Sequence, residues 1–392
     1  MRKSDVLIVG GGLIGCATAW YLAREGAKVT LLDSGDFGMG ASGQNAGSLH
    51  FQLERRFLEN GDALAEQAAR IAALSRLAIS DWSSLEADLA TDLHITMNGG
   101  LMVAETAEEC ALLERKITRE NAEGLQTRMI DGDEARQIAP YLSEAICAAG
   151  YSPDEGHADA RLVTHAIAIA AAKDGTVLRP RCRVQSIEKA GRKYVISTAE
   201  EQFAASQILI ACGAWSAHVA AMLNLHIPLF PVGLLMNATE RVAQAVPHLV
   251  QHVGRRLSMK QTHSGNLLIG GGWPSRMALD AEGRFALYRP PAVIESSLRD
   301  NLRVAIDVAP MIATISLIRS WTGITAISAD QLPIVGEIPA MPGCWVAGGG
   351  SAFTLGPTFA RLIAQSMSGR KCGELEIVAP SRFSHLNSFM GQ

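Results

Sequence analysis

A G-x-G-x-x-G motif at residues 10–15 constrains the fold more than any other feature of the sequence. It follows a short apolar run, Val6–Val9, which predicts a buried parallel strand. Apolar residues at helical spacing follow it and predict a helix over Leu13–Arg24. A second apolar strand is expected over residues 28–32. This order of elements makes one βαβ unit, so we expect a parallel sheet.

The glycines of this motif have the spacing of a dinucleotide-binding loop. Gly10 permits the tight turn, Gly12 lets a pyrophosphate approach the backbone, and Gly15 allows close packing of helix on strand. Asp33 ends the second strand, where a carboxylate can accept a hydrogen bond from a ribose hydroxyl. With strand, helix and acid all in place, the sequence predicts a dinucleotide site.

Two further glycine triplets lack this context. Residues 270–272 run into Trp273-Pro274, where no helix can open, and residues 348–350 have no glycine at the third motif position. One nucleotide fold is therefore expected, which disfavours a flavoenzyme reductase that also binds a nicotinamide dinucleotide.

The composition indicates a globular protein of two domains. The chain has 392 residues, of which 48% are hydrophobic, and a net charge of −4, so nothing drives it electrostatically towards nucleic acid. The seven cysteines are scattered with no CxxC pair, which disfavours a disulfide framework and any metal or iron–sulfur site. The first apolar run is too short for a signal peptide or a membrane span, so we expect a cytoplasmic protein with no membrane insertion.

The rest of the chain predicts alternating elements. We expect a loop over residues 35–48, an amphipathic helix or helix pair over 58–89, a helix over 162–172, and a final helix over 358–367. A three-strand run is expected over 183–187, 194–198 and 203–211, and strands should dominate 226–318. The apolar stripe from Leu64 to Leu85 fits either the core or a partner interface.

Four stretches carry a resemblance to a known family. They are residues 41–50 (ASGQNAGSLH), 208–216 (ILIACGAWS), 332–336 (LPIVG) and 346–357 (VAGGGSAFTLGP). Together they resemble, in order, the D-amino-acid-oxidase-like FAD oxidoreductases. Residues 43–50 and 269–274 (IGGGWP) look most like the β subunit of opine (octopine or nopaline) oxidases or dehydrogenases.

The resemblance implies an α/β fold of two interleaved domains. A Rossmann-like FAD-binding domain would comprise residues 1–85, 149–225 and 318–392. An α+β substrate-binding domain on a mostly antiparallel sheet would comprise residues 86–148 and 226–317.

The resemblance also implies an extended FAD along the glycine-rich segments. The residues expected to contact it are Gly10, Gly12, Leu13, Ile14, Gly15, Asp33, Ala41, Ser42, Gln44, Asn45, Ala46, Gly47, Ser48, Val184, Gly213, Trp215, Gly348, Gly350, Ser351, Ala352, Phe353, Thr354 and Leu355.

Departures from the family pattern narrow the function. Leu268 stands where sarcosine-oxidase-like members have an oxygen-activating lysine, and Gly323 stands near their FAD-linking cysteine. Thr325 and Gly350 stand where glycine-oxidase-like members place carboxylate-binding arginines. We therefore expect non-covalent FAD and disfavour a stand-alone oxidase.

Substrate contacts are expected from cations and an aromatic residue. Carboxylate-bearing substrates need such cations. The candidates are His50, Arg255, Arg256, Lys260 and Trp273. No catalytic acid or base is obligatory, because the chemistry lies in the flavin.

The leading hypothesis is an FAD-dependent opine dehydrogenase acting as the β subunit of a hetero-oligomer. Its partner would carry a second redox group, a flavin or an iron–sulfur centre, because this chain has no cysteine cluster. The alternatives are a stand-alone D-amino-acid, glycine or sarcosine-type oxidase, a D-hydroxyproline dehydrogenase or hydrogen cyanide synthase subunit, and a flavin-binding structural subunit.

Overall fold

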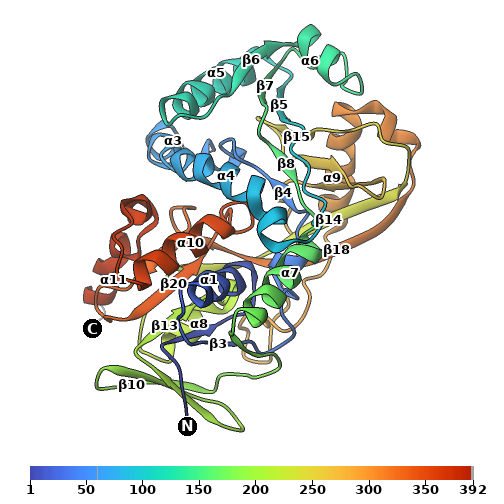
Figure 1. Ribbon diagram of the computed structural model, residues 1–392. Coiled ribbons are helices and arrows are strands. Elements are labelled where there is room, and N and C mark those ends of the chain that lie inside the picture. The colour runs from blue at the N-terminus through green and yellow to red at the C-terminus, as the bar shows by residue number, and fades with distance from the viewer. Residues whose placement is uncertain (60, 390–392) are drawn as a thin grey trace.

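A parallel sheet with one antiparallel edge strand forms the base of the molecule in the computed structural model, which describes residues 1–59 and 61–389 (Figure 1). Every residue of two of its inner strands, Val6–Val9 and Val29–Leu32, is buried, as expected for a sheet covered on both faces. In spatial order its strands are β19 (Ile334–Glu337), β20 (Cys344–Gly348), β13 (Gln207–Ile210), β2 (Val6–Val9), β3 (Val29–Leu32) and β9 (Val177–Arg179). The predicted βαβ unit is confirmed, with α1 spanning Leu13–Arg24.

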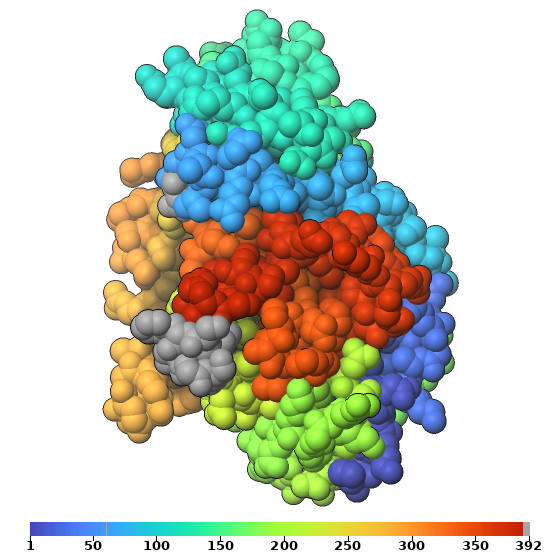
Figure 2. All heavy atoms as spheres, turned by 90° about the vertical axis from the view of Figure 1, so that its left-hand side faces the viewer, coloured from blue at the N-terminus to red at the C-terminus, as the bar shows by residue number. Residues whose placement is uncertain are grey.

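Three helices pack together on one face of this sheet. Helix α1 lies between α7 (Ala160–Lys173) and α10 (Gly356–Met367) (Figure 1). The predicted segment 58–89 is a helix pair, α3 (Asp62–Ala69) and α4 (Ala72–Leu89), and α4 packs on α10. Figure 2 shows this pair lying against the C-terminal segment. Leu74, Trp82 and Leu85 are fully buried, so the apolar stripe belongs mainly to the core and not to a partner surface.

A four-stranded sheet flanks the base and corrects the expected strand over 203–211. Its order is β1 (Arg2–Lys3), β12 (Gln202–Ala205), β11 (Lys193–Ser197) and β10 (Ser186–Ala190). The chain leaves this sheet at Ser206 and continues as β13 in the parallel sheet. The N-terminal segment also passes from the four-stranded sheet to the parallel sheet, because β1 pairs with β12 and β2 pairs with β13.

An eight-stranded sheet forms the upper part of the molecule (Figure 1). All its neighbouring strands pair antiparallel except β15 with β5. In order they are β18 (Leu317–Ser328), β14 (Leu229–Arg241), β17 (Asn266–Gly270), β16 (Ser258–Gln261), β15 (Leu249–His252), β5 (Gly100–Ala104), β7 (Ala148–Ser152) and β6 (Arg128–Asp131). Its helices are α5 (Ala107–Ala122), α6 (Gly132–Ile138) and α9 (Glu295–Val308).

Three expectations need correction. The segment 35–48 is not all loop, because it contains α2 (Ala41–Gln44) and the start of β4 (Ser48–Leu49), which pairs with β8 (Gly156–His157). Helix α9 interrupts the strand-rich region 226–318. Helix α10 is not the last helix, because α11 (Ser384–Phe389) follows it. A further short helix, α8 (Ser216–Ala221), lies between β13 and β14 in the sequence. Within the described residues no helix is long and apolar enough to cross a membrane.

The division into domains remains a proposal, and sheet membership favours two changes to it. Strands β7 and β18 belong to the eight-stranded sheet. We therefore propose that residues 149–152 and 318–328 belong with the substrate-binding domain, not the FAD-binding domain.

Candidate functional site

A cavity of about 1500 Å³ lies between the carboxyl ends of the parallel strands and the eight-stranded sheet. Parallel sheets bind ligands at that edge. The volume exceeds the roughly 300 to 1,000 Å³ of an ordinary small-molecule site. The cavity can therefore accommodate an elongated cofactor together with a substrate.

The glycine loop forms one end of this cavity. Gly10 has a φ of +110°, and a Cβ on it would lie 2.3 Å from the carbonyl oxygen of Ala211. A Cβ on Gly15 would lie 1.9 Å from the carbonyl oxygen of Gly10, so helix α1 starts directly against the loop. Gly12 faces open space apart from Ser42 Oγ at 3.0 Å. A side chain at Gly12 would fill the space that a pyrophosphate needs.

Asp33 and Ser42 complete this end. The Asp33 carboxylate accepts hydrogen bonds from the amides of Gly11 (2.6 Å) and Gly35 (2.7 Å). Burial raises the pKa of Asp33, while these two amide hydrogen bonds act in the opposite direction. Ser42 Oγ accepts from the Leu13 amide (2.9 Å). Each carboxylate oxygen keeps a second lone pair, which can accept a hydrogen bond from a ribose hydroxyl.

The loop after α2 carries a polar atom without a partner. Among described residues, Ser48 Oγ is buried and makes no hydrogen bond, although Ser48 lines the cavity. Buried hydroxyls are normally hydrogen-bonded, so this atom is placed for a ligand. Asn45 instead folds the loop, because its amide donates to the carbonyls of Ala41 and Ser42 (2.8 Å each). The cradle at Gly12, the Asp33 carboxylate and Ser48 Oγ fit an extended FAD.

The structure brings most of the predicted FAD contacts together around the cavity. Those lining it are Gly10, Gly12, Leu13, Ile14, Asp33, Ala41, Ser42, Gln44, Asn45, Ala46, Ser48, Val184, Gly213, Trp215, Gly348, Ser351, Ala352, Phe353 and Thr354. Gly15, Gly47, Gly350 and Leu355 do not line it. A Cβ on Gly47 would strike the Ala158 carbonyl oxygen, and one on Gly350 would strike the Arg56 guanidinium. The packing of the loops therefore leaves no space for a side chain at these two positions, and their contact with FAD stays a prediction.

His50 lines the cavity beside Ser258. Its Nε2 shares a hydrogen bond with Ser258 Oγ (3.0 Å), while Nδ1 is buried and has no partner among the described residues. Burial lowers the pKa of His50 to about 4, with Glu54 acting against the shift and Lys260 and Arg56 adding to it. The imidazole is thus neutral near pH 7 and can hydrogen-bond to a ligand through Nδ1.

Sequence reasoning missed a triad of polar residues next to His50. Arg56 donates to Glu54 Oε1 (3.0 Å) and to Ser351 Oγ (2.6 Å), and Ser351 Oγ donates to the same Glu54 oxygen (2.7 Å). Burial alone would raise the pKa of Glu54, but Arg56 and His50 outweigh it and lower the pKa to about 2. The sequence indicates this triad only through the charged run Glu54-Arg55-Arg56, which closely follows residues 41–50. The triad joins this run to the segment before α10.

The arginines that line the cavity differ in whether a carboxylate already neutralises them. Arg255 is bound by Glu105 (2.7 Å) and Asp307 (2.8 Å), which weakens it as a substrate ligand. Arg256 is exposed and donates to the Gly272 carbonyl oxygen (2.8 Å). Arg289 is also exposed and lies over the Tyr288 ring. In the described part of the chain neither Arg256 nor Arg289 pairs with a carboxylate.

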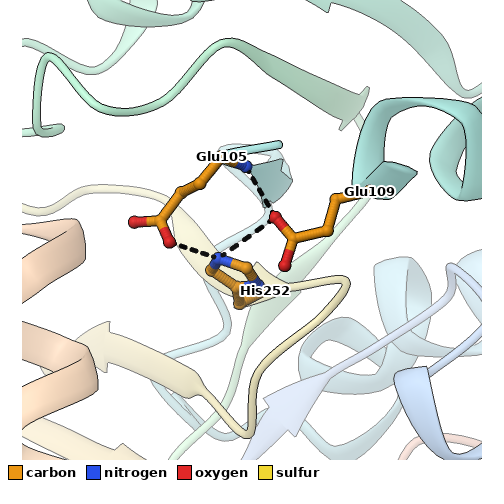
Figure 3. A group of neighbouring side chains, drawn as sticks. All are labelled: Glu105, Glu109 and His252. Atoms are coloured by element: carbon orange, nitrogen blue, oxygen red, sulfur yellow. Dashed lines mark hydrogen bonds and ion pairs between the residues drawn. The ribbon is translucent and has the colours of Figure 1, made fainter. Parts of the chain in front are cut away.

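Glu105, Glu109 and His252 form a cluster behind Arg255 (Figure 3). His252 Nδ1 accepts hydrogen bonds from the amides of Gly254 and Arg255 (3.0 Å each). The neutral ring must then carry its proton on Nε2, which points at Glu105 Oε2 (3.3 Å). A nitrogen that carries a proton has no lone pair for a metal, so this cluster holds Arg255 and its loop in place. The prediction that the chain has no metal site stays a prediction.

Lys260 and Trp273 do not line the cavity. Lys260 is buried in β16, and its Nζ donates to the Ala158 carbonyl oxygen (3.2 Å). Burial lowers the pKa of Lys260 to about 7, with Asp159 opposing the shift. It lies opposite Leu268 on the neighbouring strand. Trp273 Nε1 donates to the Arg256 carbonyl oxygen (2.8 Å), so it supports the Arg256 loop.

A buried polar network holds the segment that carries His50 and Arg56. The Gln52 amide and side chain donate to Glu155 (2.9 and 2.8 Å), and Lys116 donates to Gln52 Oε1 (2.7 Å). Lys116 also pairs with Glu120 (2.8 Å), which accepts from the Leu53 amide. Lys116, Glu120 and Glu155 have no solvent exposure. Helix α5 and the β7–β8 turn therefore position this segment through ionic hydrogen bonds.

Comparisons with known proteins agree with this geometry. The family model described as "FAD dependent oxidoreductase" (DAO) matches residues 5–366. Glycine oxidase of Geobacillus kaustophilus is 30% identical over 350 residues, which cover 89% of this chain and 88% of that protein. Its crystal structure superposes with a TM-score of 0.82 over 97% of this chain and 99% of that chain.

Two further relatives match over nearly the whole chain. An opine oxidase subunit of Rhizobium meliloti is 25% identical over 388 residues, which cover 98% of each protein. The structure of L-proline dehydrogenase from P. horikoshii is 22% identical, covers 98% of each chain and has a TM-score of 0.86, which shows a shared fold.

We expect Gly12→Val to abolish FAD binding, because the branched side chain would occupy the pyrophosphate space. Gly373→Val is the control, since a Cβ there meets nothing within 4 Å and Gly373 lies outside the cavity. The measurement is flavin released into the supernatant by acid precipitation. Normal flavin content in Gly12→Val would contradict the assignment, and yellow colour retained in the wild-type pellet would contradict non-covalent binding.

Stability should decrease as the pH falls from about 7 to 4. Burial lowers the pKa of His157 to about 3 and that of His50 to about 4, below the roughly 6.5 of an unfolded histidine. Through these two histidines the unfolded chain binds more protons below pH 6.5, so the free energy of unfolding falls. Glu155, whose pKa burial raises to about 7, acts in the opposite direction, but it is one group against two. Urea unfolding at about pH 7 and pH 5 measures this. His157→Gln should reduce the change of unfolding free energy with pH, whereas His385→Gln, at an exposed position, should not. An equal change in the wild type and both variants would contradict the role given to His157.

Proposed function

The chain belongs to the DAO family of FAD-dependent oxidoreductases, and we propose that it oxidises an opine, a secondary amine bearing at least two carboxylates, such as octopine or nopaline. At the coarser level it is an FAD-dependent amine or amino-acid oxidoreductase. We further propose that it acts as the catalytic β subunit of a hetero-oligomeric dehydrogenase, in which a partner subunit with a flavin or iron–sulfur centre receives the electrons.

FAD would be held by the residues that line the cavity at the carboxyl ends of the parallel strands. The α1 N-terminus and Gly12 would face the pyrophosphate, Asp33 the ribose, and Ser48 Oγ and the 348–354 segment the ring system. When bound, FAD supplies the acceptor for a hydride from the carbon that bears the amine nitrogen, giving an imine that water hydrolyses to an amino acid and a 2-oxo acid.

The observation that carries the opine proposal is the pair Arg256 and Arg289. Both residues line the cavity, and within the described residues neither is paired with a carboxylate. Arg183 also lines the cavity without such a partner, but it lies beside Val184, where the adenine of FAD is expected. Arginine binds carboxylates through two parallel hydrogen bonds. Two available guanidiniums suit an opine, which has two or more carboxylates, better than glycine, which has one.

His50 would orient the amine and not act as a strong base. Its pKa of about 4 keeps the ring neutral, and the unpartnered Nδ1 can exchange a hydrogen bond with the amine nitrogen. Ser258 fixes the ring through Nε2. The Glu54–Arg56–Ser351 triad would hold the two loops that flank His50 at a constant separation. These residues contribute position, which is the main contribution a protein makes to cofactor chemistry.

The main alternative is a stand-alone glycine-type oxidase, which the 30% identity to glycine oxidase favours. A D-hydroxyproline dehydrogenase or hydrogen cyanide synthase subunit would share the same flavin site but take a smaller substrate. Family membership gives no support to a flavin-binding structural subunit without catalysis.

Anaerobic bleaching of the flavin tests the substrate. We expect octopine or nopaline to bleach the purified holoprotein faster than glycine, sarcosine or hydroxyproline does. Arg256→Met should raise the opine KM about tenfold or more, because a hydrogen bond to a charged group contributes about 1.5–3 kcal/mol. Arg299→Met, on an exposed helix position outside the cavity, is the control. If glycine bleaches the flavin and no opine does, the opine proposal is wrong and the glycine-type oxidase alternative is favoured.

Oxygen reactivity tests the subunit proposal. Position 268 is a leucine, and Lys260 does not line the cavity because its Nζ is buried against the Ala158 carbonyl oxygen, so we expect the substrate-reduced chain to react slowly with oxygen. Turnover of the isolated chain should depend on an added dye, and redox-active subunits should copurify from the native host. Rapid turnover of the isolated chain with oxygen, releasing one peroxide per substrate, would refute the dehydrogenase-subunit proposal.

A further inference from the structure

Cys110 and Cys147 lie in contact although 37 positions separate them in the sequence. Their sulfur atoms are 3.0 Å apart. Cys147 is exposed and Cys110 is partly exposed, so reagents in solution can reach the pair. Cys147 Sγ also contacts the carbonyl oxygen of Ala104 at 3.3 Å, which holds it beside the start of α5.

The two cysteines join elements that come from different parts of the chain. Cys110 lies in the first turn of α5, and Cys147 immediately precedes β7 (Figure 1). Helix α5 carries Lys116 and Glu120, and the turn after β7 carries Glu155. These are the groups that hold Gln52 and Leu53 next to His50.

We propose that Cys110 and Cys147 form a dithiol modification site, which a low-molecular-weight disulfide oxidises to an intramolecular disulfide. The site does not depend on the proposed function, because neither cysteine lines the cavity. The bond would tie the first turn of α5 to the start of β7 at the surface.

The exchange proceeds in two balanced steps. The exposed Cys147 thiolate attacks one sulfur of oxidised glutathione and expels a glutathione thiolate, giving a mixed disulfide. The Cys110 thiolate then attacks the Cys147 sulfur and expels the second glutathione. The two cysteine protons pass through solvent to the two glutathione thiolates, and two electrons pass from the protein to glutathione. Burial and the neighbouring thiol raise the pKa of Cys110 to about 11, so Cys147 attacks first.

The test uses the holoprotein incubated with oxidised glutathione, followed by alkylation of free thiols and mass spectrometry. We expect the wild-type chain to lose two hydrogens and two alkylation sites, with a peptide crosslink between Cys110 and Cys147 that dithiothreitol reverses. The oxidised chain should unfold a few degrees above the reduced chain, because the crosslink restricts the unfolded state.

Single substitutions distinguish this site from general thiol reactivity. Cys110→Ser should accumulate one glutathione on Cys147, whereas Cys147→Ser should form no internal crosslink. Cys372→Ser removes a cysteine with no sulfur neighbour among the described residues and should form the crosslink as the wild type does. Glutathione that stays on wild-type Cys147, a crosslink that appears only after denaturation, or an oxidised chain that unfolds at a lower temperature would each overturn the proposal.

Discussion

The close contact between helix α1 and the loop that precedes it is the constraint on which the rest of the site depends. Gly15 lies against the Gly10 carbonyl, and Gly10 lies against Ala211, with no space for a Cβ at either position. The helix therefore begins at the carboxyl edge of the sheet with Gly12 as an N-cap that provides no side chain. Its first amides and its dipole are directed to the cavity, where they would stabilise the phosphate anion of the proposed FAD. Asp33 and Ser42 are placed by hydrogen bonds to the same turn.

A second constraint links the two large sheets. The segment from His50 to Arg56 contacts both, because His50 binds Ser258 of β16 and Arg56 binds Ser351 before α10. Buried ionic hydrogen bonds hold its backbone. Such groups are costly to bury and must remain paired, so they define a geometry more than they stabilise the fold. Glu155 illustrates the balance, because burial raises its pKa to about 7 although Gln52 donates two hydrogen bonds to it. The end of the cavity lined by His50 and Arg56 thus takes its position from residues outside it.

Charge pairing then separates the arginines that can act on a ligand from those that hold the structure. Arg56 and Arg255 line the cavity, yet each donates to carboxylates that fix its position. Arg256 and Arg289 have no such partner among the described residues, and a guanidinium at a cavity lacks only a carboxylate ligand to complete its hydrogen bonds. The proposed recognition of the substrate therefore depends on which cations the fold leaves without a carboxylate.

The sequence by itself determined the βαβ unit, with the tight turn at Gly10 and the close packing of helix on loop at Gly15. These features depend on residues within one or two elements, so periodicity and motif spacing reveal them. Only the tertiary structure decided that Gly47 and Gly350 have no space for a side chain, that Arg255 is neutralised, that Lys260 and Trp273 lie outside the cavity, and that Cys110 meets Cys147. Each of these depends on groups brought together from distant segments by strand register and helix packing, and a single sequence carries no record of such long-range contacts.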